Sequence, residues 1–328
     1  MEKFKSVTTR EINEDVAGGR IDNFLIGILK GVPKSMVYRI IRKGEVRVNK
    51  KRIKPEYKLQ CGDIVRIPPV RVSQAPVIAP SAKLTNVQKL ADSILFENEG
   101  VIVINKPARM SVHGGSGVDY GVIEALRSLR PEARYLELAH RLDRETSGCL
   151  IIAKKRSALR KLHEQFREKT MHKQYLALVC GKFPNKIKLV NAPLVKNVLS
   201  SGERFVKVDP NNGKPSITDF NIRQVITATN NQEDVVTLIE CAPRTGRTHQ
   251  IRVHLQYKGY PILGDDKYGI RENDEYYSQT YGLERMFLHA EKITFVDPIE
   301  GKEMTVIAPL TEELSNVLKN IKGKIDNN

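Results

Sequence analysis

Tryptophan is missing from this sequence, and phenylalanine and tyrosine supply an aromatic content of only 6%. Such a content argues against a broad aromatic platform for stacking single-stranded nucleic acid. The four cysteines lie far apart without a Cys-x-x-Cys pair, so we expect reduced core residues rather than a zinc site or disulfides. No apolar run approaches the ~18 residues of a membrane-spanning helix, and the residues after Met1 do not form a signal peptide. We therefore expect a cytoplasmic protein that does not bind a membrane.

Acidic residues are also in deficit. The 328 residues include 54 Lys and Arg but only 38 Asp and Glu, a formal net charge of +16. An excess of this size indicates a polyanionic partner, although charge alone does not separate nucleic acid from a membrane surface. A length of 328 residues with 40% hydrophobic content is enough for about two domains with substantial cores.

The positive charge is concentrated near the N-terminus. Residues 1–72 hold 17 Lys and Arg against 8 Asp and Glu, which is more than half of the excess charge of the whole chain. From Lys34 to Lys54 there are nine basic residues and one acidic residue. A charge run is often only a solvated helix face, but so many like charges repel one another unless a polyanion binds. This segment is therefore predicted to bind RNA.

The pattern in this segment predicts two short helices followed by short strands. Apolar residues recur at helical spacing over 21–29, and Ser35 could cap a second helix that ends at Gly44. Strands are expected around 46–48 and 64–67. The stretch 20–67 resembles the S4 RNA-binding domain. We expect RNA contacts from a largely basic set, namely Arg20, Lys34, Ser35, Arg39, Arg42, Lys43, Arg47, Asn49, Lys50 and Lys51.

We divide the chain into an S4-like domain (1–70), a proline-containing linker (71–89), a larger domain (90–321) and a disordered tail (322–328). In the larger domain, strands are expected at 101–104, 149–153, 173–179, 235–241, 287–295 and 304–307. Helices are expected after Ser157 and after Thr248, with these residues as caps. The larger domain is therefore predicted to be α+β with a largely antiparallel sheet. The glycine-rich turn 114–117 lacks the Gly-Lys-Ser/Thr ending of a phosphate-binding loop, so no nucleotide cofactor is expected.

One motif decides the functional interpretation. Residues 140–148 read His-Arg-Leu-Asp-Arg-Glu-Thr-Ser-Gly, so Asp143 lies between Arg141 and Arg144 just before a strand. Neighbouring positive charges favour the ionised carboxylate, which suits a nucleophile or a base. Taken alone, the pattern fits a surface salt bridge better than a catalytic group. A second arginine-rich segment at 244–254, costly for a plain core element, favours a functional site.

These segments resemble the pseudouridine synthases that act on ribosomal and transfer RNA. The resemblance extends to Asn105-Lys106-Pro107, to 173–179 and to Leu288-His289-Ala290, and so covers nearly the whole chain. It implies that uridine is flipped out of the RNA, cleaved at its N1 glycosidic bond and re-attached through C5, without metal or cofactor.

The same resemblance assigns roles to four residues. It implies that Asp143 attacks the sugar or removes a proton from it, and that Arg247 pairs with Asp143. It implies that Tyr175 packs on the uracil and helps to remove the C5 proton. Arg141 is expected either to fill the space left by the flipped base or to contact a phosphate.

The expected substrate is large-subunit ribosomal RNA or its assembly precursor, modified at several uridines by a monomeric enzyme. Another ribosomal site or transfer RNA is the alternative for the same chemistry. A non-catalytic S4-type ribosome assembly factor is a second alternative. A glycoside hydrolase is the third, with Glu145 as the nearby second carboxylate. Specificity is expected to come from the basic N-terminal segment and from surface loops at 191–213 and 268–282.

Overall fold

The computed structural model describes residues 6–14, 16–29, 32–70, 80–114, 120–198, 204–229 and 231–323. The chain separates into two compact units, Met1–Ile78 and Ala79–Asn328, and each is described here by itself. In the described residues, no helix has both the length and the apolar content needed to span a bilayer.

The N-terminal unit packs two helices on a small sheet. Its strands are ordered β1 (Thr8–Glu11), β4 (Ile64–Ile67), β2 (Arg47–Val48) and β3 (Lys51–Arg52), all antiparallel. Helices α1 (Ile21–Ile28) and α2 (Lys34–Arg42) bury their apolar faces in one core. The two predicted helices are confirmed. The predicted cap is wrong, because α2 begins at Lys34 after Pro33 and Ser35 lies inside the helix.

The larger unit is built on a mixed, largely antiparallel sheet, as predicted. Its main path runs β10-β13-β14-β9-β15-β8-β6-β5, with β16 paired to β15 and β7 paired to β8. The one parallel pairing among the described strands joins β15 to β8. The strands are β5 (Ile94–Glu97), β6 (Val101–Lys106), β7 (Glu137–Leu138), β8 (Ser147–Ala153), β9 (His172–Cys180), β10 (Leu189–Asn191), β13 (Ile217–Thr227), β14 (Val235–Pro243), β15 (Leu288–Val296) and β16 (Glu303–Ile307).

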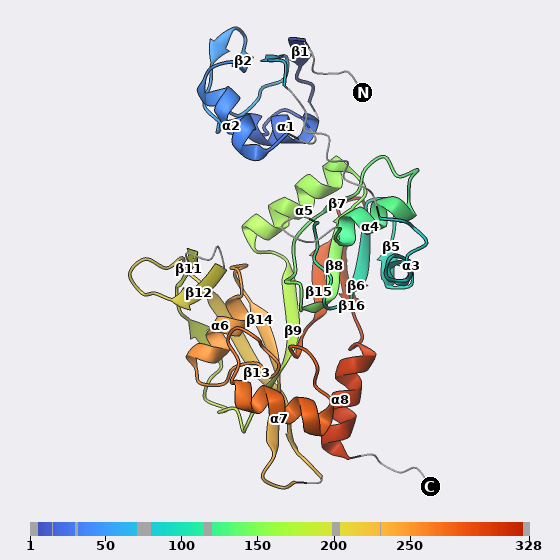
Figure 1. Cartoon of the computed structure of the whole chain (residues 1–328), viewed down its shortest axis with the longest axis vertical. Helices are drawn as coiled ribbons and strands as arrows, with labels where there is room; N and C mark the ends of the chain where they lie inside the picture. The colour runs from blue at the N-terminus through green and yellow to red at the C-terminus, as the bar shows by residue number, and fades with distance from the viewer. Residues whose placement is uncertain are drawn as a thin grey trace. The chain divides into compact units, whose positions relative to one another are not determined.

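Helices cover both faces of this sheet, because alternate residues of each strand point to opposite sides. In the half with β6 and β8, α3 (Thr85–Ala91) and α4 (Val122–Leu129) pack on one face and α5 (Arg156–Glu168) on the other. In the half with β9 and β14, α7 (Arg271–Tyr281) and α8 (Glu312–Lys322) pack on one face and α6 (Gln250–Tyr257) on the other. Figure 1 shows α7 and α8 side by side at one end of this unit.

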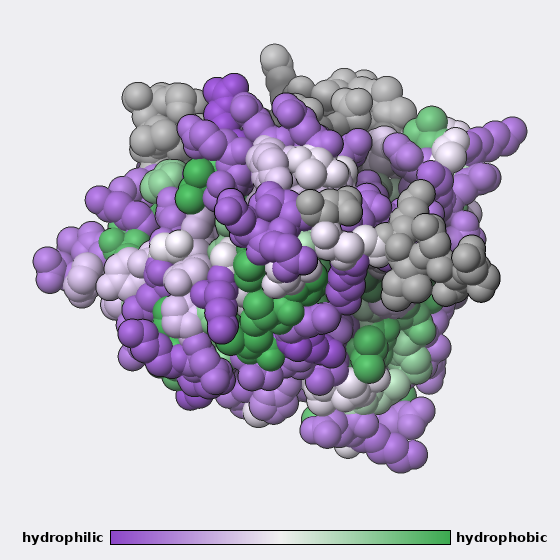
Figure 2. All heavy atoms as spheres, turned by 90° about the horizontal axis from the view of Figure 1, so that it is seen from below, coloured by the Kyte–Doolittle hydropathy of each residue, from purple (hydrophilic) through white to green (hydrophobic). Residues whose placement is uncertain are grey.

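A small hairpin lies beside α6. It consists of β11 (Leu194–Val198) and β12 (Arg204–Val208), which form a separate two-stranded sheet. Val206 of this hairpin packs in one cluster with Val253 and Tyr268. Figure 2, viewed from below relative to Figure 1, shows a mainly hydrophilic surface with hydrophobic side chains gathered in small patches.

Several finer predictions require correction. The predicted surface loops contain regular structure, since 191–213 includes β11 and β12 and 268–282 includes α7. Helices α5 and α6 begin after Lys155 and His249, so Ser157 and Thr248 are not their caps. Cys61 is exposed rather than part of the core. Helix α3 begins at Thr85, ahead of the boundary predicted at residue 90.

Some predictions lie outside the described residues in part. Of the predicted linker, residues 71–79 are not described, and the same holds for Gly115, Ser116 and Gly117 of the glycine-rich turn. The predicted tail is outside from residue 324 onward, whereas α8 extends through Lys322.

Candidate active site

Asp143 lies in the loop between β7 and β8, and a buried lysine ties this loop to the sheet. The Lys106 ammonium, fully buried at the end of β6, donates hydrogen bonds to the carbonyl oxygens of Pro107 (2.7 Å), Met110 (2.9 Å) and Arg144 (3.1 Å). Burial lowers the pKa of Lys106 to about 7, an effect that the charge of Glu145 opposes. Lys106, which the sequence marked only by resemblance, thus fixes the residue next to Asp143.

The far end of the loop, where β8 begins, is held by two buried side chains, His289 and Arg285. His289 Nε2 donates to the Ala308 carbonyl at 3.1 Å, so Nδ1 accepts the Ser147 hydroxyl at 2.9 Å. Burial lowers the pKa of His289 to about 4, which keeps the ring neutral. Arg285 Nη2 donates to the same Ser147 oxygen at 3.1 Å, and Nη1 reaches the Glu145 carbonyl at 3.5 Å. The loop that carries Asp143 is therefore anchored on both sides.

The loop borders a cavity of about 540 Å³. The predicted site residues Asp143, Tyr175, Arg247 and Arg141 all line it, although they come from three separate segments of the chain. Basic side chains dominate its polar lining, namely Arg141, Arg167, Lys169, Lys173, Arg244, Arg247 and Arg252. The volume lies in the range of small-ligand sites, which is ~300–1,000 Å³.

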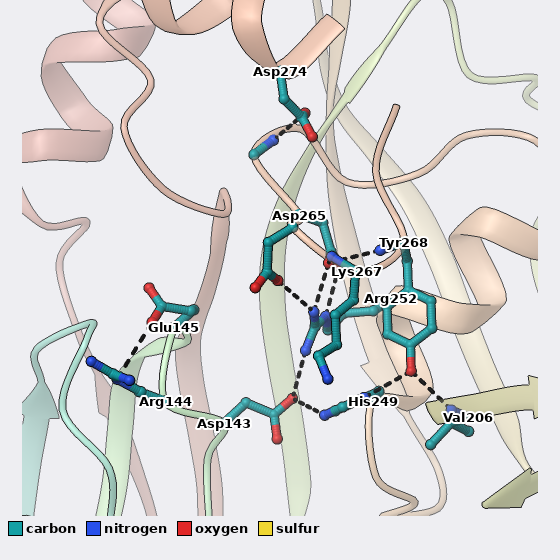
Figure 3. A network of polar contacts seen from close by, with 12 residues as sticks. Asp143, Arg144, Glu145, Val206, His249, Arg252, Asp265, Lys267, Tyr268 and Asp274 are labelled. Carbon is teal, nitrogen blue, oxygen red and sulfur yellow. Dashed lines mark hydrogen bonds and ion pairs between the residues drawn. The ribbon is translucent and has the colours of Figure 1, made fainter. Parts of the chain in front are cut away.

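Two nitrogen atoms approach the Asp143 carboxylate, and both approach the same oxygen. Arg252 Nη1 is 3.6 Å from Oδ2, and His249 Nε2 is 3.8 Å from it. Figure 3 shows the second oxygen pointing away from both partners. One oxygen is thus directed toward two nitrogen donors, and the other is left for a reacting group.

The predicted pairing of Arg247 with Asp143 is wrong. Arg247 lies on the cavity wall, where its Nε donates to the Pro215 carbonyl at 3.2 Å, and Arg252 takes the expected place beside Asp143. The flanking arginines do not contact the carboxylate either, since Arg144 reaches Glu145 (3.7 Å) and the side chain of Arg141 is exposed.

The sequence held a signal for Arg252. It stands between Ile251 and Val253 on a helix with an inward apolar face, and a charged residue there is expected to be buried and paired. His249 and Arg252 are the two functional residues that sequence reasoning missed.

A second carboxylate holds Arg252 firmly. Asp265 accepts from Nε at 2.7 Å and from Nη2 at 2.6 Å, and the side chains of both residues are buried. The Tyr268 ring lies 5.0 Å from the guanidinium carbon. Burial alone would lower the pKa of Arg252, but the hydrogen bonds and charge of Asp265 raise it overall. Arg252 is therefore a fixed positive charge beside Asp143.

Tyr175 lies in the middle of β9, opposite Cys241 of β14, and faces the cavity. Burial raises the pKa of Tyr175, and the negative charge of Asp143 raises it further. The phenol is therefore protonated near neutral pH. This state favours packing and hydrogen-bond donation over proton removal.

Lys173, two residues earlier on β9, is a half-buried positive charge on the cavity wall. Its ammonium lies 6.0 Å from the centroid of the Phe166 ring, and burial lowers its pKa. In the described structure no carboxylate lies within ion-pair distance of it. Nearby, burial and the charge of Lys173 lower the pKa of His140 to about 3, so that ring is neutral.

The predicted RNA-contacting residues of the N-terminal unit are all exposed. Arg39, Arg42 and Arg47 donate to neighbouring atoms of the unit, and two other residues contact carboxylates. Arg20 is paired with Asp22 at 2.6 Å, and the Asn49 amide donates to Asp63 at 2.8 Å while its oxygen accepts from the Ile64 N–H at 2.9 Å. The others, on and after α2, present a basic face. Across the described residues, no group of His, Cys, Asp or Glu side chains could hold a metal ion.

Comparison with known proteins identifies the family of this chain. Residues 100–257 match the family model "RNA pseudouridylate synthase", and residues 19–65 match "S4 domain". The chain is 56% identical over 324 residues to the ribosomal large subunit pseudouridine synthase C of Pasteurella multocida, covering 99% of this chain and 97% of that protein. It is 57% identical to the protein of the same name from Escherichia coli K12, covering 97% and 98%.

Solved structures extend the comparison to distant relatives. Human RNA pseudouridylate synthase domain containing 4 matches with a TM-score of 0.56 and 25% identity, covering 72% of this chain and 95% of that one. Human RNA pseudouridylate synthase domain containing 1 matches with a TM-score of 0.57 and 26% identity, covering 70% and 88%. Because a catalytic family model and an S4 model both match, and relatives of the C type match along nearly the full length, the chain belongs to the RNA pseudouridine synthases, among the C-type enzymes of the ribosomal large subunit.

Proposed function

We propose that this chain converts specific uridines of large-subunit 23S ribosomal RNA to pseudouridine, with Asp143 as the catalytic carboxylate. The observation that carries the proposal is the Asp143 side chain itself. It has two nitrogen donors near one oxygen, a second oxygen that contacts no donor among the described residues, and a position on the wall of a basic cavity. The substrate is inferred from the relatives, whose names refer to the ribosomal large subunit.

The site acts on a nucleotide that has left its stack. A uridine inside folded RNA cannot reach the cavity, so it must be flipped out, at a cost of roughly a few kcal/mol. We propose that the basic lining offsets this cost by binding the phosphates on either side of the target. Arg141, exposed on the rim, either fills the vacated space or contacts a phosphate.

The chemistry is an isomerisation. The bond from C1′ to N1 breaks, the uracil rotates, and a bond from C1′ to C5 forms while the proton of C5 is lost and N1 gains one. Asp143 either attacks C1′ or takes a proton from the sugar, and an ionised carboxylate serves both routes. Arg252 orients that carboxylate by its charge, and Tyr175 packs against the base as it turns.

The glycoside hydrolase alternative requires a second carboxylate, and Glu145 does not line the cavity. Glu145 faces Arg144 at 3.7 Å, and among the residues that line the cavity Asp143 is the one acid. Hydrolases usually place two carboxyl groups ~5–9 Å apart around the bond they cleave. The non-catalytic assembly factor accounts for the basic N-terminal face but gives no reason for the anchored Asp143 loop.

The test is carbodiimide-based pseudouridine mapping on unmodified large-subunit ribosomal RNA. The RNA is incubated with the wild-type protein, with Asp143→Asn, and with Glu145→Gln as a control that alters a carboxylate of the same loop outside the cavity. We expect new stops at a few uridines with the wild type and the control, and none with Asp143→Asn. Stops on transfer RNA alone would identify transfer RNA as the substrate. An absence of stops on both RNAs would favour the hypothesis of a non-catalytic assembly factor.

A further inference from the structure

A chain of polar contacts leads from the β11–β12 hairpin to Asp143. The backbone N–H of Val206 donates to the hydroxyl oxygen of Tyr268 at 3.0 Å. The same hydroxyl lies 2.8 Å from Nδ1 of His249, and Nε2 of His249 lies 3.8 Å from Oδ2 of Asp143. Figure 3 shows these four residues in a row, with Arg252 approaching the same carboxylate oxygen from above.

Hydrogen-bond counting fixes the tautomer of His249. The phenol of Tyr268 has one proton, its oxygen accepts the N–H of Val206, and among the described residues Nδ1 of His249 is the one acceptor seen within hydrogen-bond distance of the hydroxyl, so we assign the proton to the Tyr268–Nδ1 contact. Burial raises the pKa of Tyr268, which keeps that proton on the phenol. Burial lowers the pKa of His249, which keeps the imidazole neutral despite the charge of Asp143. A neutral ring that accepts at Nδ1 has its proton at Nε2, which is the nitrogen facing Asp143.

The backbone of His249 is held in an uncommon conformation for this purpose. Its φ of 53° places a non-glycine residue in the left-handed region, immediately before α6. Such conformations persist only where surrounding contacts fix them, and they concentrate at functional sites. The carbonyl of His249 accepts the N–H of Val253 at 2.9 Å, and the Tyr268 ring meets the imidazole edge-on at a centroid distance of 5.6 Å.

We propose that His249 and Tyr268 are positioning residues for Asp143. The Nε2–H of His249 and the guanidinium of Arg252 together hold Oδ2 and leave Oδ1 as the reacting oxygen. The 3.8 Å separation is longer than a hydrogen bond, and we expect it to shorten in the complex with RNA, because catalytic hydrogen bonds tighten when substrate binds. The hairpin is part of this arrangement, because Val206 directs the Tyr268 proton toward His249. The inference rests on the catalytic role of Asp143 proposed above.

Tyr268→Phe tests the proposal most directly. It keeps the ring that contacts Arg252 and the hairpin cluster but removes the hydroxyl. The hydrogen bond between the neutral phenol and the neutral imidazole contributes enough that we expect a loss of about three- to tenfold in the single-turnover rate at saturating enzyme. RNA affinity, measured by filter binding, should stay within about twofold of the wild type. Tyr281→Phe is the matched control, since it removes another hydrogen-bonded hydroxyl from a buried tyrosine far along α7.

A pair of substitutions at His249 separates donation from packing. His249→Gln retains an amide N–H that can reach Asp143, whereas His249→Leu retains only bulk. We expect the single-turnover rate of the glutamine variant to be at least fivefold higher than that of the leucine variant. Circular dichroism checks that both variants are folded. A wild-type rate for Tyr268→Phe, or a loss confined to RNA affinity, would overturn the proposal. Asp143→Asn is run in parallel, because residual activity there would instead reject the role of Asp143.

Discussion

Arg252 contacts three carboxylates unequally, the weakest hydrogen bond being that to the exposed Asp266 at 3.4 Å. Asp265 accepts two hydrogen bonds from it, at 2.6 and 2.7 Å, whereas Asp143 lies at 3.6 Å and accepts none. The geometry separates two tasks, with Asp265 fixing the guanidinium and Asp143 remaining available for reaction. A tight Arg252–Asp143 pair would instead occupy the carboxylate that must act.

Removal of either partner of the buried pair should destabilise the protein strongly. Arg252→Gln leaves Asp265 buried without its paired guanidinium, and Asp265→Asn leaves Arg252 with only the longer contacts to Asp143 and Asp266, so each should cost about 3 kcal/mol in free energy of unfolding. The double variant should recover more than half of that loss and still be inactive, because Asp143 has lost its positive neighbour. Urea denaturation with single-turnover assays measures both. Equal stability of the single variants and the wild type would contradict the assignment.

Arg247 should behave differently from Arg252. Because its side chain lies on the cavity wall away from Asp143, Arg247→Gln is expected to weaken RNA binding about three- to tenfold, as for one lost phosphate contact, with little change in the saturated rate. Filter binding and single-turnover kinetics on the same RNA separate these effects. A collapse of the saturated rate would restore Arg247 to the catalytic group.

Lys173 should show a trade-off between function and stability. Its half-buried ammonium has a pKa lowered by burial and no acidic partner in the described structure, so Lys173→Met is expected to stabilise the free protein by about 1 kcal/mol. The same change should raise the Kd for RNA, because a phosphate or a uracil oxygen loses its donor. Thermal melting without RNA and filter binding provide the two readouts. Lys169→Met, at an exposed position of the same rim, is the control for stability.

At this scale the sequence predicted Asp143, Tyr175 and Arg141 as cavity residues but assigned the wrong arginine. The reason is local and physical. Helix α6 starts at Gln250 after a left-handed His249, instead of directly after a Thr248 cap, and Arg252 lies in the first helical turn facing Asp143. No periodicity in the sequence indicates a left-handed residue that is not glycine.

Elements with a clear apolar period were predictable. Strands β8, β9, β14, β15 and β16 lie where alternating or continuous apolar runs indicated them. Helix α7 was not predicted, because its sequence is almost wholly polar and it buries only Tyr277 and Tyr281. The hairpin strands β11 and β12 were missed for a related reason, since their packing on α6 depends on Tyr268, more than sixty residues downstream of Val206.

Helix α7 supports the site through one carboxylate. Asp274 accepts the N–H of Gly264 at 2.6 Å and so fixes the turn that leads to Asp265. Burial raises the pKa of Asp274 from 3.8 to about 6. The folded protein therefore binds more protons than the unfolded chain between pH 4 and 6, and stability falls as pH rises through that window.

Asp274→Asn should consequently be more stable than the wild type at pH 7, by ~2 kcal/mol, because asparagine still accepts from Gly264 but has no charge to desolvate. The difference should shrink as pH falls through 6 and vanish below 4. Thermal melting from pH 4 to 7 checks this, with the exposed Glu272→Gln of the same turn as control. A stability gap independent of pH would show that Asp274 does not titrate as described.

At the scale of the whole molecule, the exposed positive charge should determine RNA affinity and have little effect on the rate of the chemical step. The basic residues on and after α2 are exposed and belong to a unit that has its own core. Replacing Lys34, Arg39, Arg42 and Lys43 by glutamine should weaken RNA binding steeply and reduce the slope of log K against log salt by up to ~3. The saturated rate should be unchanged. The control, Lys302→Gln with Lys319→Gln, should leave the slope as it is, and an unaltered slope in the fourfold variant would remove this face from the RNA interface.

The parallel pairing of β8 with β15 has a consequence for how the enzyme is made. Ser147 and Gly148 lie beside His289 and Ala290, and Arg285 joins the Asp143 loop to Thr311 and Glu313 near the end of the chain. Contacts so distant in sequence form late in folding. During synthesis the N-terminal unit can fold and engage RNA while the catalytic loop still lacks its supports. A ribosome would therefore have to finish nearly the whole polypeptide before the new enzyme could modify any uridine.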